Sequence, residues 1–164
     1  MFSFAIVIAA AFLPLFLDVR YPMKYESLIR VESKRNGLDP SLVAAVIATE
    51  SGYEEAVVSP KGAVGLMQIM PTTARYVCEI FGINFEPDRL VEPEYNVKIG
   101  CCYLRYLSAR FSGVDVPAAY NAGEGNVIGW KETESGIPFR ETREYVKRVV
   151  RAKRYYDIKY GSRG

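Results

Sequence analysis

Beyond about residue 24, apolar positions recur with the 3.6-residue period of helices, without the strict alternation typical of strands. Clusters of Gly, Pro, Asn and Ser, which favour turns, separate the periodic segments. The pattern predicts helices at residues 23–35, 39–50, 71–81, 93–111, 117–121, 126–131 and 140–160. We therefore expect a single, mostly α domain, because 164 residues are enough for one hydrophobic core.

The amino end differs from the rest of the chain, because residues 1–17 carry no charged side chain. This run is close to the shortest apolar length that spans a bilayer. We expect residues 1–19 to be a signal peptide or membrane anchor, and residues 20–164 to form the folded domain. No Lys or Arg precedes the apolar run, and Arg20 follows it, which departs from the usual export signal. A buried first helix is the alternative interpretation.

The composition excludes several classes of catalyst. The chain has no His, which rules out Ser-His-Asp triads, Cys-His dyads and His-ligated zinc. Its three cysteines form no C-x-x-C pair, so we expect buried thiols, no disulfide framework and no zinc site. No metal or organic cofactor is implied. The net charge of +2 gives no indication of a nucleic-acid partner.

The carboxyl end is basic, since residues 139–164 carry nine Lys or Arg and three Asp or Glu. Such a segment favours either a surface for an anionic polymer or lipid, or a solvated helix face. The sequence alone leaves both interpretations open.

Glu50 is the first candidate for chemistry. It continues the apolar stripe of the helix at residues 39–50, three residues after Ile47 and four after Val46. No Lys or Arg occurs between residues 35 and 61, and the last turn of a helix disfavours negative charge. Both features, together with burial, raise the pKa of a carboxyl, as a general acid near neutral pH requires. The alternative is an ordinary exposed Glu at a helix end.

Two later segments contain the residue types that bind sugars. Residues 62–65 are rich in Gly and Ala, which let the backbone approach a ligand, and the amide of Gln68 follows them. Further along, Tyr120 and Asn121 stand next to a Gly-rich turn. Aromatic rings pack on the apolar face of a sugar, and amides bind its hydroxyl groups. We therefore expect these segments to line a glycan-binding cleft.

Four spaced motifs resemble the signature of the soluble lytic transglycosylase (SLT) domain family. They are E-S at 50–51 with S-x-x-G-A-x-G-L-M-Q-x-M-P-x-T-A at 59–74, N-x-x-x-G-x-x-Y-L at 96–104, A-Y-N-A-G at 119–123, and P-x-x-E-T-x-x-Y-V at 138–146. They follow the family's order, and the similarity covers about residues 24–155.

The resemblance implies a mostly α, lysozyme-like domain that cleaves the β-1,4 bond between N-acetylmuramic acid and N-acetylglucosamine in peptidoglycan. The family does so without water and leaves a 1,6-anhydro-muramic end. Its catalytic Glu falls on Glu50, which is implied to act first as acid and then as base. The implied substrate-binding residues are Ser59, Met67, Gln68, Tyr120, Asn121 and Glu141.

The same resemblance sets expectations for partner and location. The partners are the glycan strands of peptidoglycan, and we expect a monomer. This substrate lies outside the cytoplasmic membrane. We therefore expect the protein either to lie at the extracytoplasmic face of a bacterial membrane, associated through residues 1–19, or to be secreted to the cell wall or periplasm.

Two other functions remain open from the sequence. A muramidase would share the fold but use water. Ordinary glycosidases flank the bond with two carboxylates, about 5–5.5 Å apart when retaining and about 6.5–9.5 Å apart when inverting. Glu54, Glu55, Glu124 and Glu141 are candidates for the second carboxylate, and nothing in the sequence fixes any of them near Glu50. The other possibility is a catalytically silent cell-wall binding module, which the intact Glu50 argues against.

Overall fold

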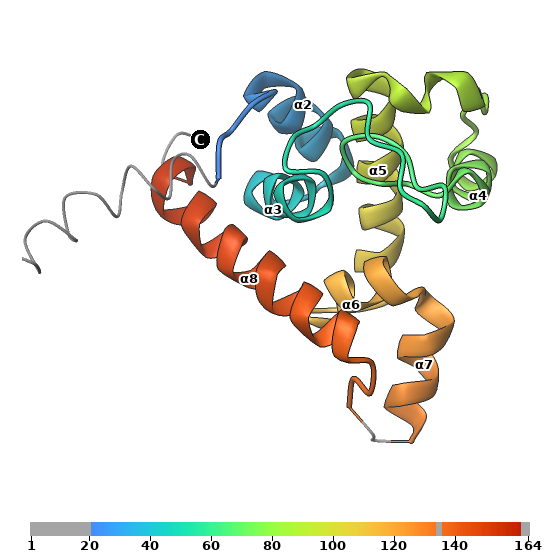
Figure 1. The fold of residues 1–164 in the computed structure, drawn as a ribbon, viewed down its shortest axis with the longest axis vertical. Coiled ribbons are helices and arrows are strands. Elements are labelled where there is room, and N and C mark those ends of the chain that lie inside the picture. Colours follow the sequence, from blue (N-terminus) through green and yellow to red (C-terminus); the bar gives the residue numbers. More distant parts are fainter. Residues whose placement is uncertain (1–20, 134–135, 162–164) are drawn as a thin grey trace, which may run out of the picture.

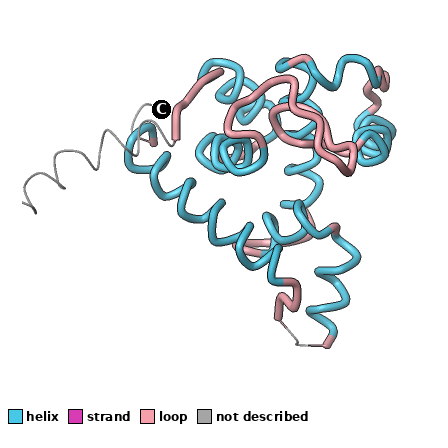
Figure 2. Tube along the Cα trace, in the orientation of Figure 1, coloured by secondary structure: helices cyan, strands magenta, loops and turns pink. Residues whose placement is uncertain are grey.

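The protein is all-α in the computed structural model, which describes residues 21–133 and 136–161. Figure 2 shows no β-strand in these residues, and only isolated bridges join Val58 to Val64 and Val64 to Ile69. The predicted mostly α class is therefore confirmed. The elements are α2 (Glu26–Asn36), α3 (Pro40–Glu50), α4 (Pro71–Phe81), the 3-10 helix η1 (Pro87–Val91), α5 (Pro93–Ser108), α6 (Asp115–Ala122), α7 (Glu124–Glu132) and α8 (Arg140–Tyr160).

Each predicted helix is present, with ends that differ by a few residues at most. Helix α3 begins at Pro40 because the Asp39 carboxylate accepts a hydrogen bond of 2.8 Å from the N–H of Ser41. Helix α4 ends where Gly82 adopts a left-handed conformation, with φ of 63°. The short helix η1 is the one element that the sequence pattern does not predict.

Helices α5 and α8 organise the packing. Helix α5 contacts α2, α4 and α6, whereas α8 runs along one edge of the molecule against α3 and α6 (Figure 1). Helix α3 lies between α2 and α8 and buries the unbroken run from Val43 to Ala48. A helix that is apolar on nearly every side needs such cover. Glu50, the last residue of α3, consequently lies at the edge of the core and not on an exposed helix face.

The buried amide of Asn96, on α5, holds the long loop between α3 and α4. Its Oδ1 accepts a hydrogen bond from the N–H of Met67 at 2.8 Å. Its Nδ2 donates to the carbonyl oxygens of Val64 at 2.9 Å and Leu90 at 2.8 Å. Gly65 passes so close that a Cβ there would meet the Asn96 side chain and would lie 2.7 Å from the Leu90 carbonyl oxygen. This loop is therefore fixed against α5.

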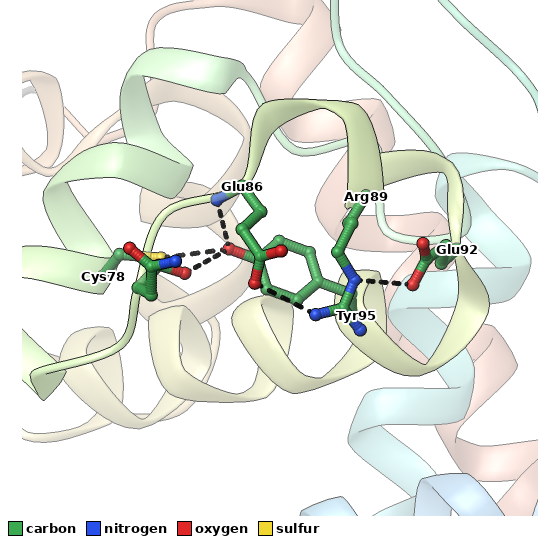
Figure 3. Close-up of polar contacts among 6 residues, drawn as sticks. Cys78, Glu86, Arg89, Glu92 and Tyr95 are labelled. Carbon is green, nitrogen blue, oxygen red and sulfur yellow. Dashed lines mark hydrogen bonds and ion pairs between the residues drawn. The ribbon is translucent and has the colours of Figure 1, made fainter.

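A second polar cluster, around Tyr95, fixes the segment between α4 and α5 (Figure 3). The Tyr95 hydroxyl donates to the carbonyl of Asn84 at 2.9 Å and accepts from the N–H of Glu86 at 3.0 Å. Arg89 donates to the carboxylates of Glu86 and Glu92, and its guanidinium lies 5.0 Å from the centre of the Tyr95 ring. These contacts are structural, since they join η1 to α5.

All three cysteines, Cys78, Cys101 and Cys102, are buried and unpaired, as predicted. Within the described part of the chain, none of the helices combines the length and apolar character needed to cross a bilayer. The leader or anchor predicted for residues 1–19 lies outside the described residues.

Candidate active site

Glu50 is half-buried at the last position of α3, where the core opens. Burial raises the pKa of its carboxyl from 4.5 to about 7, because the charged form loses solvation. Within the described residues, Glu50 forms no ion pair with Lys or Arg. Its carboxyl is consequently protonated in a large fraction of molecules near neutral pH, as the helical pattern predicted.

Two side chains of α8 moderate this rise. The hydroxyl of Tyr145 and the guanidinium of Arg148 both favour the ionised carboxylate and lower the pKa of Glu50. Tyr145 is buried, and its hydroxyl has no partner in good hydrogen-bond geometry among the described residues. The Tyr145 hydroxyl is therefore buried close enough to Glu50 to favour its ionised form.

Glu50 opens into a cleft of about 400 Å³ between the α3–α4 loop, α6 and the start of α8. A second cavity, of about 210 Å³, continues from it and shares Gln68, Met70, Tyr120 and Asn121. The first cavity is lined by Glu50, Ser59, Pro60, Lys61, Ala63, Gln68, Met70, Tyr120, Asn121 and Glu141. The structure therefore brings together Glu50 and five of the six predicted substrate-binding residues.

Backbone geometry in the α3–α4 loop presents two of these residues. Ser59 starts a tight turn, in which its Oγ accepts from the N–H of Ala63 at 3.0 Å. Gln68 adopts a φ of +46°, and its Nε2 donates to the carbonyls of Val57 at 3.0 Å and Gly65 at 2.9 Å. The Gln68 amide is thereby fixed in orientation at the junction of the two cavities.

Helix α6 presents the aromatic ring and the second amide. The Tyr120 hydroxyl donates to the carbonyl of Met67 at 2.8 Å, which ties α6 to the loop. The Asn121 Oδ1 accepts from the hydroxyl of Thr142 on α8 at 2.8 Å, which sets the orientation of this amide. Both side chains therefore face the cleft in defined positions before any ligand binds.

Met67 is the predicted residue that the structure does not place in the cleft. Its side chain is fully buried and packs against Gly100 of α5, where even a Cβ would collide with it. The methionine that lines the cleft is instead Met70, which is 37% exposed and borders both cavities. Met67 contributes through its backbone, whose N–H binds Asn96 and whose carbonyl binds Tyr120.

Among the candidate second carboxylates, only Glu141 lies in the cleft with Glu50. Glu124 is engaged elsewhere, because it accepts from the Tyr106 hydroxyl at 2.7 Å and pairs with Arg110 at 3.5 Å. Glu54 and Glu55 are exposed and line neither cavity. The cleft thus contains two carboxyl groups, on α3 and at the start of α8.

Sequence reasoning did not assign Tyr145 and Arg148 to the site. The signal was nevertheless available, since Tyr145 is one helical turn beyond Glu141 and shares its side of α8. A larger cavity of about 520 Å³ lies elsewhere, between α2 and α5, where charges of both signs surround Tyr95. It contains none of the predicted site residues, so we place the candidate site at Glu50.

Comparison with known proteins identifies the family and the fold. The family model of the transglycosylase SLT domain matches residues 27–142, so the chain belongs to this family. Solved structures confirm the lysozyme-like fold. The 70-kDa soluble lytic transglycosylase from Escherichia coli has a TM-score of 0.84 and 37% identity, covering 88% of this chain and 26% of that one.

Two further relatives support the same family and fold. An inactive mutant of the lytic transglycosylase Slt from Pseudomonas aeruginosa has a TM-score of 0.82 and 35% identity, covering 89% of this chain and 26% of that one. The soluble lytic murein transglycosylase of E. coli K12 is 38% identical over 154 residues, which are 85% of this chain and 24% of the relative. The chain therefore spans about a quarter of the length of these relatives.

Proposed function

We propose that this chain is a lytic transglycosylase that cleaves the β-1,4 bond between N-acetylmuramic acid and N-acetylglucosamine in peptidoglycan. The observation that carries the proposal is Glu50, a half-buried carboxyl with a pKa raised to about 7, at the wall of a polar cleft. A group that titrates near neutral pH can both give and take a proton in one turnover. The names of the relatives support the same activity.

The chemistry uses one carboxyl group twice, first as acid and then as base. Protonated Glu50 donates to the glycosidic oxygen while the bond between this oxygen and C1 of the muramoyl residue breaks. The substrate's own acetamido group stabilises the oxocarbenium-like centre. The Glu50 carboxylate then takes the proton of the muramoyl C6 hydroxyl, whose oxygen bonds to C1 and closes the 1,6-anhydro ring. No water is consumed, and Glu50 ends the cycle protonated.

The other cleft residues hold the glycan. We assign sugar binding to Ser59, Gln68, Tyr120 and Asn121, whose side chains line the cleft. Gln68 and Asn121 are oriented by hydrogen bonds to neighbouring segments, so their remaining polar atoms meet sugar hydroxyls with little loss of freedom. Met67 acts indirectly, by holding the Tyr120 hydroxyl with its carbonyl.

Mass spectrometry of the products tests this function. The full chain is incubated with purified peptidoglycan, next to Glu50→Gln and the control Glu54→Gln, which changes an exposed acid outside the cleft. We expect muropeptides one water lighter than hydrolysis products from the wild type and the control, and none from a folded Glu50→Gln. A Glu-to-Gln change in the inactive P. aeruginosa relative supports this expectation. Full activity in Glu50→Gln would end the assignment.

A muramidase is the second candidate, and one observation favours it. Glu141 shares the cleft with Glu50, as the two-carboxylate mechanism of glycosidases requires. Products with reducing ends, lost in Glu141→Gln, would establish this function instead. Glycan binding without any product from a folded wild-type chain would indicate the catalytically silent binding module.

We further propose an extracytoplasmic location, either at a membrane or in the wall. Relatives named membrane-bound lytic murein transglycosylase C support it, such as that of Mannheimia succiniciproducens, 35% identical over 117 residues. In this proposal, the uncharged residues 1–17 serve as a leader or anchor for the folded domain.

A further inference from the structure

One side of α8 is basic and uncovered along its whole length. Arg140, Arg143, Lys147, Arg151 and Arg154 follow one another at spacings of three and four residues, so they share one side of the helix. All five are exposed. We call this stripe the basic face. In Figure 1, α8 lies along the edge of the molecule with α3 and α6 on its inner side.

The charge of the basic face is largely unneutralised. The ion pairs of α8 in the described residues involve only Lys147, with Glu144 at 2.9 Å, and Lys153. Within the same residues, Arg140, Arg151 and Arg154 form no ion pair with a carboxylate. An ordinary solvated helix face intersperses charges of both signs. Here the five cations share the stripe, and the acidic residues Glu144 and Asp157 lie at its borders, each paired with a lysine of α8. This face therefore suits an anionic partner.

Apolar side chains lie on the same stripe. Val150 is 48% exposed and Ile158 is 75% exposed, and both follow the spacing of the basic residues. A free anionic polymer in water would gain little from these two side chains. A phospholipid boundary meets both requirements, because phosphates attract the cations and the acyl region accepts apolar groups.

The start of the folded domain lies beside the same helix. The ring of Tyr21 packs on those of Tyr155 and Tyr156, with centroids 5.3 and 6.1 Å apart. The Tyr156 hydroxyl also donates to the carbonyl of Pro22 at 2.9 Å. Only residues 18–20 separate this point from the uncharged run 1–17, a reach of about 10 Å in extended chain. A bilayer that held residues 1–17 would therefore pass close to α8.

We propose that the basic face of α8 binds the anionic headgroups of a phospholipid membrane, as a second attachment beside residues 1–17. A basic surface adds electrostatic attraction to anionic lipids to whatever attachment the apolar residues 1–17 provide. The arrangement leaves the cleft accessible. Glu141 follows Arg140 by one residue, about 100° around the helix, so the cleft opens to the side of the basic face. The surface is separate from the proposed cleavage site.

Vesicle partitioning of the full chain tests the proposal. The vesicles contain phosphatidylcholine alone or mixed with phosphatidylglycerol, and the neutral vesicles measure the contribution of residues 1–17. The test variant is Arg151→Gln with Arg154→Gln. The control is Lys34→Gln with Lys98→Gln, which removes the same charge from exposed positions on α2 and α5. Thermal melts and cleavage of soluble glycan strands show that each variant is folded and that its cleft is intact.

We expect the wild type to prefer the anionic vesicles, with a preference that salt weakens. The test variant should lose about 30-fold in partitioning to them, which corresponds to about 2 kcal/mol for two cations at the surface, while the control changes little. Equal binding to both vesicle types, or equal losses in both variants, would overturn the proposal. Binding to a soluble polyglycerol phosphate that depends on Arg151 and Arg154, without a vesicle effect, would assign the face to a wall polymer instead.

Discussion

Replacing Glu50 by Gln is expected to stabilise the folded protein, and to do so more at alkaline than at acidic pH. The amide of Gln mimics the protonated carboxyl that the half-buried position favours. In the unfolded chain the carboxyl of Glu50 regains its ordinary pKa of 4.5, whereas in the folded state its pKa is about 7. Between these values the folded state binds more protons than the unfolded state, so wild-type stability falls as the pH rises.

The size of the effect follows from the two pKa values of Glu50. A tenfold difference in proton affinity between the folded and unfolded states corresponds to about 1.4 kcal/mol. The rise of the pKa from 4.5 to about 7 therefore costs the wild type about 3 kcal/mol once the pH exceeds both values. Glu50→Gln removes this cost. At the lowest pH, where Glu50 is protonated in both states, the two proteins should be equally stable. For a domain of this size, about 3 kcal/mol raises the melting temperature by about 6–12 °C.

Urea unfolding at about pH 4.5 and about pH 8 gives the measurement, as the difference between variant and wild type at each pH. Glu54→Gln is the control, because Glu54 is exposed and should show no such dependence on pH. The same stabilisation at both pH values, or a loss of stability at about pH 8, would refute the reasoning that burial dominates the electrostatics of Glu50.

Three further predictions concern the surroundings of the site. Tyr145→Phe removes a hydroxyl that lowers the pKa of Glu50, so the alkaline limb of the kcat/KM profile should move to higher pH, while Tyr76→Phe leaves it in place. An unmoved limb would contradict the contact. Asn96→Ala should destabilise the fold by about 3 kcal/mol in urea unfolding, because it leaves buried backbone groups without partners; a loss below about 1 kcal/mol would contradict this role. The three cysteines should resist iodoacetamide until the protein unfolds, since burial raises the thiol pKa values of Cys101 and Cys102, the latter to about 11. Rapid labelling of the native protein, measured by mass spectrometry, would show otherwise.

Local signals explain why the helices were predictable. The start of α3 depends on Asp39 and Pro40, and the end of α4 depends on Gly82. These signals, like the apolar periodicity within each helix, involve only neighbours along the chain. The helix η1 also begins with a proline, Pro87, but it is only five residues long and has no side-chain cap, so its local signal is weak. It forms because Tyr95 and the buried Asn96 of α5 hold its flanks, which are contacts that periodicity does not report.

The sequence by itself determined the fold class, the helix order and the position of Glu50 at the end of an apolar helix, because these follow from local pattern. Only the tertiary structure decided which side chains meet Glu50. Met67 and Met70 belong to one motif, yet packing against Gly100 buries the first and leaves the second in the cleft. The pKa of Glu50 is likewise a tertiary property, since burial by other helices raises it and α8 lowers it. The burial of Met67 and the pKa of Glu50 both depend on distances between residues that are far apart in the sequence, and local sequence patterns do not determine these distances.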